Sequence, residues 1–338
     1  MSLEFEPAAL RRWCDAQFGP ADAPPEIARI SGGQSNPTFF VTHGDRQLVL
    51  RKQPPGPLLK GAHAVDREFR VLRALAGTDV PVPEALAFEA DPKVLGTPFY
   101  VMARLNGRVC PTYALSELAP PDRRPALLDM ARTLGRLHAV RPEAVGLGDY
   151  GRPGDYFQRQ MSRWSRQYAA SPSEPIPELD ALRNWLTAAM PEDDGAVSIA
   201  HGDFRMGNMM LHPTEPRVIA VLDWELSTLG HPLADLGFAC MAWHSAPSEY
   251  GGLLGVDLDA EALPEMTAFT AAYRETAPET APLNPFHVAF AMFRFAVIFV
   301  GIADRAAAGS AADRDAADLA PLAHAFAARG LAVTALTF

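Results

Sequence analysis

Two short motifs constrain this chain more than any other feature: HGDFRMGN at His201–Asn208 and VLDWE at Val221–Glu225. They set a carboxylate (Asp203), an amide five positions later (Asn208) and a second carboxylate after an apolar run (Asp223). Metal-assisted phosphoryl transfer needs a base that orients the attacking hydroxyl and oxygen ligands that hold Mg²⁺ on the nucleotide phosphates. Mg²⁺ prefers such hard oxygen ligands. We therefore predict that Asp203 is the catalytic base and that Asn208 and Asp223 bind the metal.

The residues between the two motifs favour this interpretation. Met209–Leu211 and the β-branched run Arg217–Leu222 are separated by the turn Pro213–Pro216, which predicts a β-hairpin. Such a hairpin would bring Asn208 and Asp223 to the same end. The competing interpretation is that these polar residues only form turns or cap a helix.

A glycine pair near the N-terminus is a candidate phosphate site. Predicted strands at Ile27–Ile30 and Thr38–Val41 flank a loop that contains Gly32, Gly33 and Ser35. Glycine lets backbone N–H groups approach phosphate oxygens, and a serine hydroxyl can add a donor. A plain hairpin loop would also explain this sequence.

The next strand, Gln47–Lys52, ends in two cations, Arg51 and Lys52, and helical spacing follows over His63–Leu75 with Glu68 inside it. A strand cation paired with a helical glutamate is how kinases hold the α- and β-phosphates. Because consecutive strand residues face opposite sides, only one of the two cations can face the nucleotide. Solvated surface charges remain the alternative.

The motifs resemble a known family. HGD-x₄-N followed by LDWE is similar to the catalytic loop and metal motif of the aminoglycoside phosphotransferase-like kinases, which are small-molecule kinases. The longer string His212–Leu236, and the cationic aromatic segment Tyr156–Tyr168, resemble the subgroup whose kinase-like domain also occurs fused to acyl-CoA dehydrogenases. The resemblance extends from about Ile30 to Arg305.

This resemblance implies a protein-kinase-like α+β fold with two lobes. Residues 1–104 would form a nucleotide-binding lobe with a small antiparallel sheet and one helix, and residues 105–338 a mainly helical catalytic and acceptor-binding lobe. The family commonly has V-L-R at the strand cation, which favours Arg51 over Lys52. Asp235 matches the aspartate that braces the catalytic loop in the family.

The donor implied by the resemblance is ATP with Mg²⁺, although a choice between ATP and GTP is left open. The strand Pro98–Ala103 would be the last strand of the small lobe, so Met102, Ala103 and Leu105 would line the adenine pocket. A role for Met102 as an ordinary core residue is the alternative.

The spacing of two aspartates decides the class of acceptor. Only eleven residues separate Asp223 from Asp235, which leaves no room for the activation segment of a protein kinase. The acceptor is therefore expected to be a small molecule with a hydroxyl group. The subgroup resemblance ranks a hydroxyacyl-CoA, a CoA thioester, first. An aminoglycoside, amino alcohol or sugar is the second choice, and a nucleotide-binding pseudokinase the third. Cations available for CoA phosphates are Arg159, Arg163, Arg166, Arg294 and Arg305.

Composition limits the partners and the compartment. A net charge of −10 argues against a nucleic-acid partner. Three dispersed cysteines without a CxxC pattern, and an acidic N-terminus unlike a signal peptide, predict a cytoplasmic protein. The most apolar segment, Val288–Ile302, contains Arg294 and is shorter than the roughly 20 residues of a membrane span. We expect it to be a buried helix, with no membrane partner, and we leave a homodimer open.

Overall fold

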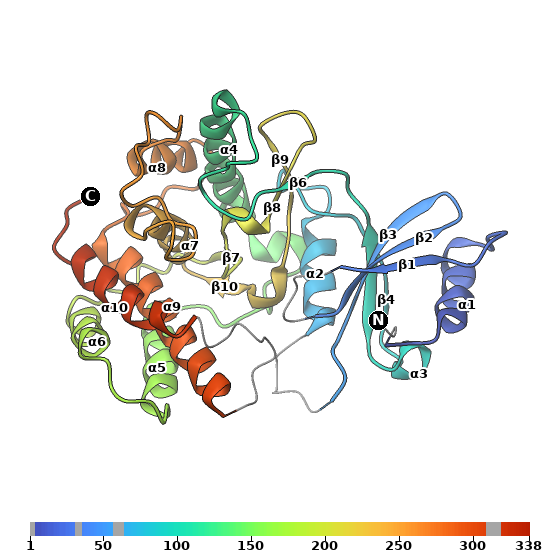
Figure 1. The fold of residues 1–338 in the computed structure, drawn as a ribbon, viewed down its shortest axis with the longest axis horizontal. Helices are drawn as coiled ribbons and strands as arrows, with labels where there is room; N and C mark the ends of the chain where they lie inside the picture. The colour runs from blue at the N-terminus through green and yellow to red at the C-terminus, as the bar shows by residue number, and fades with distance from the viewer. Residues whose placement is uncertain (1–3, 31–35, 57–63, 309–318) are drawn as a thin grey trace. The chain divides into compact units, whose positions relative to one another are not determined.

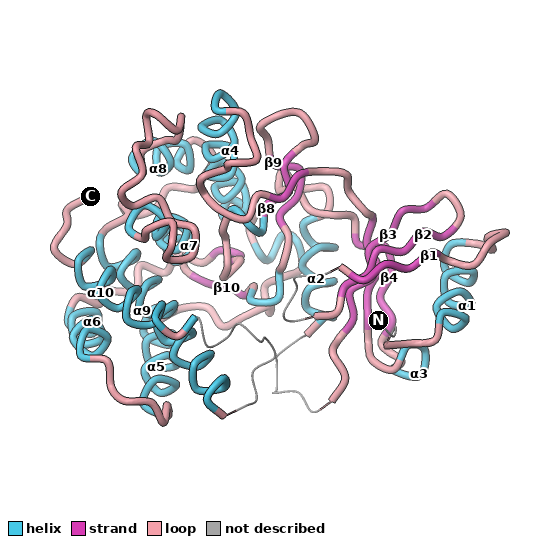
Figure 2. Tube along the Cα trace, in the orientation of Figure 1, coloured by secondary structure: helices cyan, strands magenta, loops and turns pink. Residues whose placement is uncertain are grey.

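The computed structural model describes residues 4–30, 36–56, 64–308 and 319–338. The chain forms two compact units, one of Met1–Gly107 with Ala220–Glu225 and one of Arg108–Ile219 with Leu226–Phe338. The predicted fold class is confirmed, because the first unit is built on an antiparallel sheet and the second is mainly helical (Figure 2). The assignment of nucleotide binding to residues 1–104 and of acceptor binding to 105–338 stays a prediction.

The smaller unit contains a five-stranded sheet of order β1-β2-β3-β5-β4. Its strands are β1 (Glu26–Arg29), β2 (Thr38–His43), β3 (Arg46–Lys52), β4 (Ala85–Glu89) and β5 (Phe99–Ala103). Its helices are α1 (Pro7–Phe18), α2 (Val65–Leu75) and the short α3 (Pro92–Leu95). Helices α1 and α2 lie on opposite sides of the sheet (Figure 1).

Successive side chains of β3 point alternately to the α1 side and to the α2 side of the sheet. Leu48 and Leu50 pack into the core cluster with Trp13 of α1. Arg51 has the opposite parity and therefore points to the side of α2, where its antiparallel partner in β5 is Tyr100. This alternation decides which cation reaches Glu68.

The larger unit begins at β6 (Arg108–Val109) and continues with α4 (Pro120–Ala139), η1 (Pro142–Val145), α5 (Tyr156–Ala169) and α6 (Pro177–Ala188). Short strands and 3₁₀ turns follow: β7 (Ser198–Ala200), η2 (Met206–Asn208), β8 (Met209–Leu211), β9 (Val218–Val221), η3 (Trp224–Leu226) and β10 (Thr228–Gly230). Of these, β9 and η3 include residues of the segment Ala220–Glu225, which belongs to the smaller unit. The remaining elements are α7 (Pro232–Cys240), η4 (Met241–His244), α8 (Met266–Arg274), α9 (Pro285–Ala307) and α10 (Pro321–Val333).

The strand pairing of this region confirms the predicted hairpin. β8 and β9 are neighbours in a sheet of order β6-β8-β9, and His212 donates its N–H to the carbonyl of Arg217 at 2.9 Å. β7 pairs with β10 in a separate two-stranded sheet. The catalytic loop therefore starts at the end of β7 and ends where β8 begins.

Two helices are longer than local sequence signals indicate. Helix α4 begins at Pro120 and contains Pro125, a residue that could itself begin a helix. The expectation that the apolar segment is too short for a membrane span was wrong. Helix α9 has 23 residues and is long and apolar enough to span a membrane, but 72% of its most apolar window is buried within the protein. The expectation of a buried core helix holds on burial, with α9 packed against α5, α7 and α10.

A histidine at the start of α9 makes the stability of the fold sensitive to acid. His287 is buried, and its Nδ1 accepts the backbone N–H of Asn284, which completes a capping box. Burial lowers the pKa of His287 to about 4. Its neutral form is the one that fits the native state, so this stability is present above the ordinary pKa and is lost as the pH falls.

We expect wild-type protein to lose roughly 3 kcal/mol more unfolding free energy than His287→Gln between pH 7 and pH 4. Glutamine at this position keeps a capping-box acceptor and removes the titration. Urea unfolding at several pH values measures the difference. His324→Gln, at an exposed position of α10, is the control and should follow the wild type. Parallel curves for His287→Gln and wild type would contradict the linkage.

Candidate active site

The catalytic loop of the larger unit brings Asp203 and Asn208 together. The amide nitrogen of Asn208 donates to the backbone carbonyl of Asp203 at 2.8 Å and to its carboxylate Oδ2 at 2.7 Å. These two bonds use both amide hydrogens. The amide oxygen of Asn208 is therefore the atom of this side chain that can bind a metal, as the predicted role requires.

Arg205 is a neighbour of Asp203 that the sequence did not single out. Its Nε donates to Oδ2 of Asp203 at 3.3 Å. The guanidinium lies against the backbone of Gly207, where an added Cβ would be 2.5 Å from Nη1 of the arginine. Glycine at this position thus lets the arginine lie beside the carboxylate. The signal in the sequence is the position of Arg205, two residues after Asp203 within the motif.

A buried aspartate of α7 holds the start of this loop. Asp235 is 2% exposed and accepts the backbone N–H groups of His201 at 2.5 Å and Gly202 at 3.0 Å. Nε2 of His138 lies 3.7 Å from its carboxylate. Burial alone would raise the pKa of Asp235, but His138 and the other polar neighbours outweigh burial and lower it. The predicted bracing role of Asp235 is confirmed.

Gly202 allows the tight path that this bracing needs. Its φ is +84°, and an added Cβ would lie 2.7 Å from the carbonyl oxygen of Leu226. A side chain here would be both strained and obstructed.

We expect Asp235→Asn to destabilise the protein by about 1–3 kcal/mol, because asparagine keeps one acceptor oxygen for two buried N–H groups. The value of kcat should fall together with the melting temperature, since the loop that carries Asp203 loses an anchor. Differential scanning calorimetry and turnover assays measure both. Asp180→Asn, on a half-buried residue of α6, is the control. An unchanged melting temperature for Asp235→Asn would contradict the bracing role.

Arg294 of α9 makes a second contact to the loop that the sequence analysis missed. Its Nη2 donates to the carbonyl oxygen of Gly202, and its guanidinium lies 5.7 Å from the ring of Trp164 and 5.6 Å from that of Phe238. The sequence analysis predicts this cation among those available for CoA phosphates. The structure instead uses it to fix the loop. The presence of one cation in the apolar segment Val288–Ile302 was the sequence signal for a specific buried partner.

The other candidate cations also have neighbours of their own. Arg159 donates to the carbonyls of Arg152 and Pro153, and Arg166 donates to that of Ser162. Their convergence on CoA phosphates stays a prediction.

The smaller unit contains the other half of the predicted residues, gathered around Arg51. Nε of Arg51 lies 3.0 Å from the Glu68 carboxylate, and Nη2 donates to Oδ1 of Asp223 at 2.7 Å. Glu225, which the sequence analysis did not assign, lies 3.7 Å from Nη2. Asp223 has a φ of +64°, a left-handed conformation that aspartate tolerates better than most residues. One arginine therefore faces three carboxylates.

Glu68 is a buried member of this cluster and not a surface charge. It is 1% exposed, and it accepts hydrogen bonds from the Asn36 amide at 2.6 Å and from the Tyr100 hydroxyl at 3.0 Å. Burial raises the pKa of Glu68 to about 7, although Arg51 opposes the rise. The two extra partners hold the glutamate in position to orient Arg51.

Lys52 lies on the other face of the sheet. It is 1% exposed, and its Nζ donates to the carbonyl of Leu95 at 3.0 Å. The choice between the two cations is therefore settled in favour of Arg51 as the partner of Glu68. Binding of phosphate by Arg51 stays a prediction.

The remaining predicted nucleotide residues are placed only in part. Gly32, Gly33 and Ser35 lie outside the described residues. Met102 and Ala103 end β5, and Leu105 follows it. The N–H of Ala103 donates to the carbonyl of Glu84, and that of Arg104 to Gln47. These two donors serve the sheet, so adenine recognition by this segment stays a prediction.

The donor atoms present suit magnesium held jointly by protein and phosphate. Asp223 has a carboxylate oxygen to offer, and Asn208 an amide oxygen. Within the described ranges, no group of three or more His, Cys, Asp or Glu side chains is arranged to hold a metal by itself. Mg²⁺ is commonly bound by one or two carboxylates together with phosphates and water, so the residues fit it.

Residues 26–279 match the phosphotransferase enzyme family. The chain belongs to this family. The match confirms the predicted enzyme class, a phosphotransferase of the kinase type. The fold agrees, since a crystal structure of a provisionally named aminoglycoside phosphotransferase from Ralstonia eutropha superimposes with a TM-score of 0.87 at 41% identity. That alignment covers 97% of this chain and 98% of the other.

More distant family members share the fold. A thermostable mutant of the aminoglycoside phosphotransferase APH(4)-Ia, solved in a ternary complex with AMP-PNP and hygromycin B, aligns over 97% of this chain and 99% of its own. The TM-score is 0.63 and the identity 17%. At this identity the likeness concerns the fold alone.

The curated relatives are longer proteins. Acyl-CoA dehydrogenase family member 10 of Mus musculus is 38% identical over 314 residues, which are 91% of this chain and 29% of that protein. Family member 11 of Gallus gallus is 39% identical over 312 residues, which are 90% of this chain and 40% of that protein. The chain thus spans about a third of the length of these relatives. The resemblance to the dehydrogenase-associated subgroup is confirmed.

Proposed function

We propose that this phosphotransferase uses ATP and Mg²⁺ to phosphorylate a hydroxyl group of a hydroxyacyl-CoA. The observation that carries the proposal is the pairing of Asp203 with Asn208 in a braced loop, in a chain of the phosphotransferase family. A binding module has no need of a positioned base beside a metal-binding amide, which argues against a pseudokinase.

The chain's own residues account for the transfer as follows. Asp203 accepts the proton of the acceptor hydroxyl as its oxygen forms a bond to the γ-phosphorus. The bond from that phosphorus to the bridging oxygen of the nucleotide breaks, and ADP leaves. Asn208 and Asp223 would hold the metal, which supplies neutralisation of the developing phosphate charge. Arg51, oriented by Glu68, would hold the α- and β-phosphates.

The names of the curated relatives support the choice of acceptor. They are acyl-CoA dehydrogenases, so an acyl-CoA is the natural substrate class for a region shared with them. Phosphorylation turns a hydroxyl into a better leaving group, which prepares the acyl chain for further reaction. An aminoglycoside is the second candidate, favoured by the provisional name of the Ralstonia protein. Location in the cytoplasm and assembly as a homodimer remain parts of the proposal.

Incubation of the purified protein with ATP, Mg²⁺ and separate hydroxyacyl-CoAs, aminoglycosides and amino alcohols tests this function. ADP release and the mass of the product are the readouts. We expect phosphorylation of a hydroxyacyl-CoA and poor turnover of the free hydroxy acid, which lacks the remote binding energy of CoA. Added salt should weaken binding because CoA is an anion. Turnover of an aminoglycoside with none of any hydroxyacyl-CoA would favour the antibiotic-type function, and ATP binding without turnover would favour the pseudokinase.

A further inference from the structure

A small pocket lies beside the catalytic loop, entirely within the larger unit. Arg205, the neighbour of Asp203, forms one side of it. Its volume is about 20 Å³, which is room for roughly one water molecule. Side chains from the segment before α4, from η4, from α9 and α10 and from the loop after η4 also line it: Tyr113, Ala242, Phe295, Phe326 and Tyr250.

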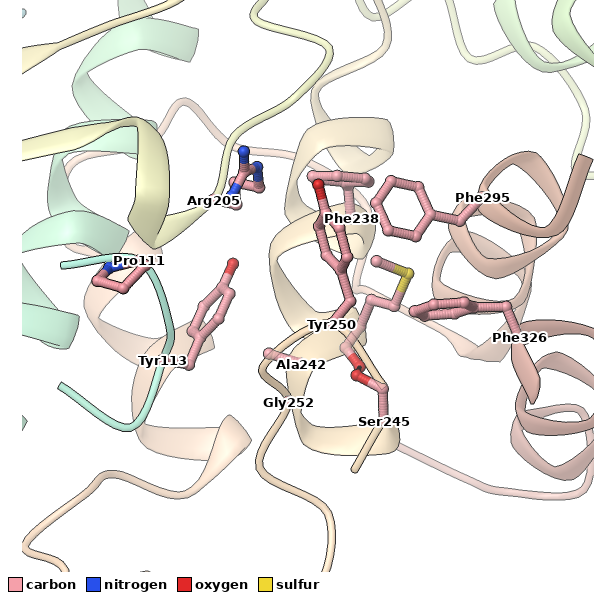
Figure 3. A pocket seen from close by; sticks show the side chains of 11 residues that line it. Pro111, Tyr113, Arg205, Phe238, Ala242, Ser245, Tyr250, Gly252, Phe295 and Phe326 are labelled. Carbon is pink, nitrogen blue, oxygen red and sulfur yellow. Dashed lines mark hydrogen bonds between the residues drawn. The ribbon is translucent and has the colours of Figure 1, made fainter. Parts of the chain in front are cut away.

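The pocket has a polar side and an apolar side. The hydroxyl of Tyr113 points toward Arg205, whereas the rings of Phe295 and Phe326 lie on the far side (Figure 3). These two rings meet edge to face at 5.0 Å. Of the described residues that line the pocket, Arg205 alone is charged. Such a lining favours an uncharged, apolar group that carries a polar atom at the Arg205 side, and disfavours a polycation.

Among the side chains that line the pocket, Tyr250 has the most freedom to move because it is partly exposed to solvent. Its side chain is 44% exposed, and its ring lies 5.0 Å from that of Phe295 and 5.4 Å from the guanidinium of Arg205. Its φ of +72° is an uncommon conformation for a bulky residue. The loop itself is fixed beside it, because Glu249 is hydrogen-bonded to Arg329 of α10 at 2.9 Å. A rotation of the tyrosine side chain would enlarge the pocket without unfolding the loop.

On the basis of the function proposed above, we propose that this pocket binds the alkyl segment of the acceptor that lies beyond its reactive hydroxyl. The hydroxyl then lies at the polar side, near Asp203, and the segment replaces the Tyr250 ring against Phe295. Arg205 is a positioning residue for the base. Each buried methylene contributes ~0.8 kcal/mol, which corresponds to about fourfold in binding.

The test compares Tyr250→Ala with Tyr250→Phe on a series of hydroxyacyl-CoAs. The hydroxyl stays at a fixed carbon, and the alkyl segment beyond it is lengthened one carbon at a time. For wild type we expect kcat/KM to rise about fourfold per methylene until the pocket is full. Tyr250→Ala should raise the ratio of kcat/KM for long over short segments about tenfold or more. Tyr250→Phe keeps the ring, so its ratio of kcat/KM for long over short segments should stay close to that of wild type.

A variant that reduces the volume of the pocket should have the opposite effect to that of Tyr250→Ala. Ala242→Leu should lower kcat/KM for long segments about tenfold relative to its value for the shortest substrate. Ala328→Leu, at an exposed position of α10, is the matched control. Equal effects of Tyr250→Ala on every chain length would overturn the proposal, as would a wild-type profile for a folded Ala242→Leu.

Binding of straight-chain 1-alkanols separates this inference from the proposed function. Calorimetric titration of the ATP-free protein with butanol to octanol needs neither CoA nor phosphoryl transfer. Affinity that rises with chain length and is lost in Ala242→Leu supports the pocket, even when no hydroxyacyl-CoA is turned over and the acceptor proposal fails. Turnover of hydroxyacyl-CoAs without any dependence on the alkyl segment overturns the pocket and leaves the proposed function intact.

Discussion

Replacement of Asp203 by alanine is expected to lower kcat by about 10²–10⁴-fold while ATP still binds. General-base catalysis contributes a factor of this size, equivalent to roughly 3–5 kcal/mol of barrier. The structure adds that Asn208 donates two hydrogen bonds to Asp203, one of them to the backbone carbonyl, which alanine retains. The loop should therefore remain near its native path in the variant. Steady-state kinetics and calorimetric titration with ATP measure the two quantities separately.

Asp203→Asn is the matched control for the loss of side-chain volume in Asp203→Ala. It keeps the size of the side chain but supplies a poor proton acceptor, so kcat should fall by a similar factor. Near-normal turnover by either variant with the true acceptor would show that another group is the base.

Replacement of Asp223 by alanine should weaken the binding of ATP only when Mg²⁺ is present. A metal ligand is lost, so affinity for Mg·ATP and kcat are both expected to fall, the latter roughly 10²-fold or more. Without Mg²⁺ the effect on ATP affinity is expected to be the opposite. Removal of a carboxylate near the phosphates leaves Arg51 freer to attract them. ATP should then bind at least as tightly as to wild type. Titrations with and without Mg²⁺ give both values.

Glu225→Gln distinguishes a metal ligand from a general member of the carboxylate cluster. Glu225 lies 3.7 Å from Arg51, whereas Asp223 lies 2.7 Å from it. A small change in Mg·ATP affinity for Glu225→Gln beside a large one for Asp223→Ala supports the assignment. Unchanged affinity of Asp223→Ala for Mg·ATP would refute it.

Much of the fold followed from local sequence patterns. The short apolar run within Gln47–Lys52 and the turn at Pro213–Pro216 predicted β3 and the β8–β9 hairpin, because strand and turn signals act over a few positions. Helix ends were less certain. Prolines at 120, 121 and 125 each fit the start of a helix, and the structure begins α4 at the first of them.

Local sequence also does not decide whether α9 is a membrane span or a buried helix. Length and hydropathy treat α9 as long enough to span a bilayer, and only the neighbouring helices show that most of it is buried within the protein. The core of a large helical unit and a lipid bilayer are alike in their demand for apolar side chains, so composition does not separate them.

The sequence by itself determined the chemistry: a carboxylate and an amide at the spacing of a phosphotransferase loop, a second carboxylate after a strand, and too few residues for a peptide acceptor. Only the tertiary structure decided which partners hold the supporting side chains. Arg51 was selected over Lys52 because α2, with Glu68, packs on one face of the sheet. Arg294 donates a hydrogen bond to the carbonyl of Gly202, which is 92 positions away in the chain. Such partners are chosen by burial, since a charge removed from water needs the nearest complementary group in space, whatever its distance in sequence.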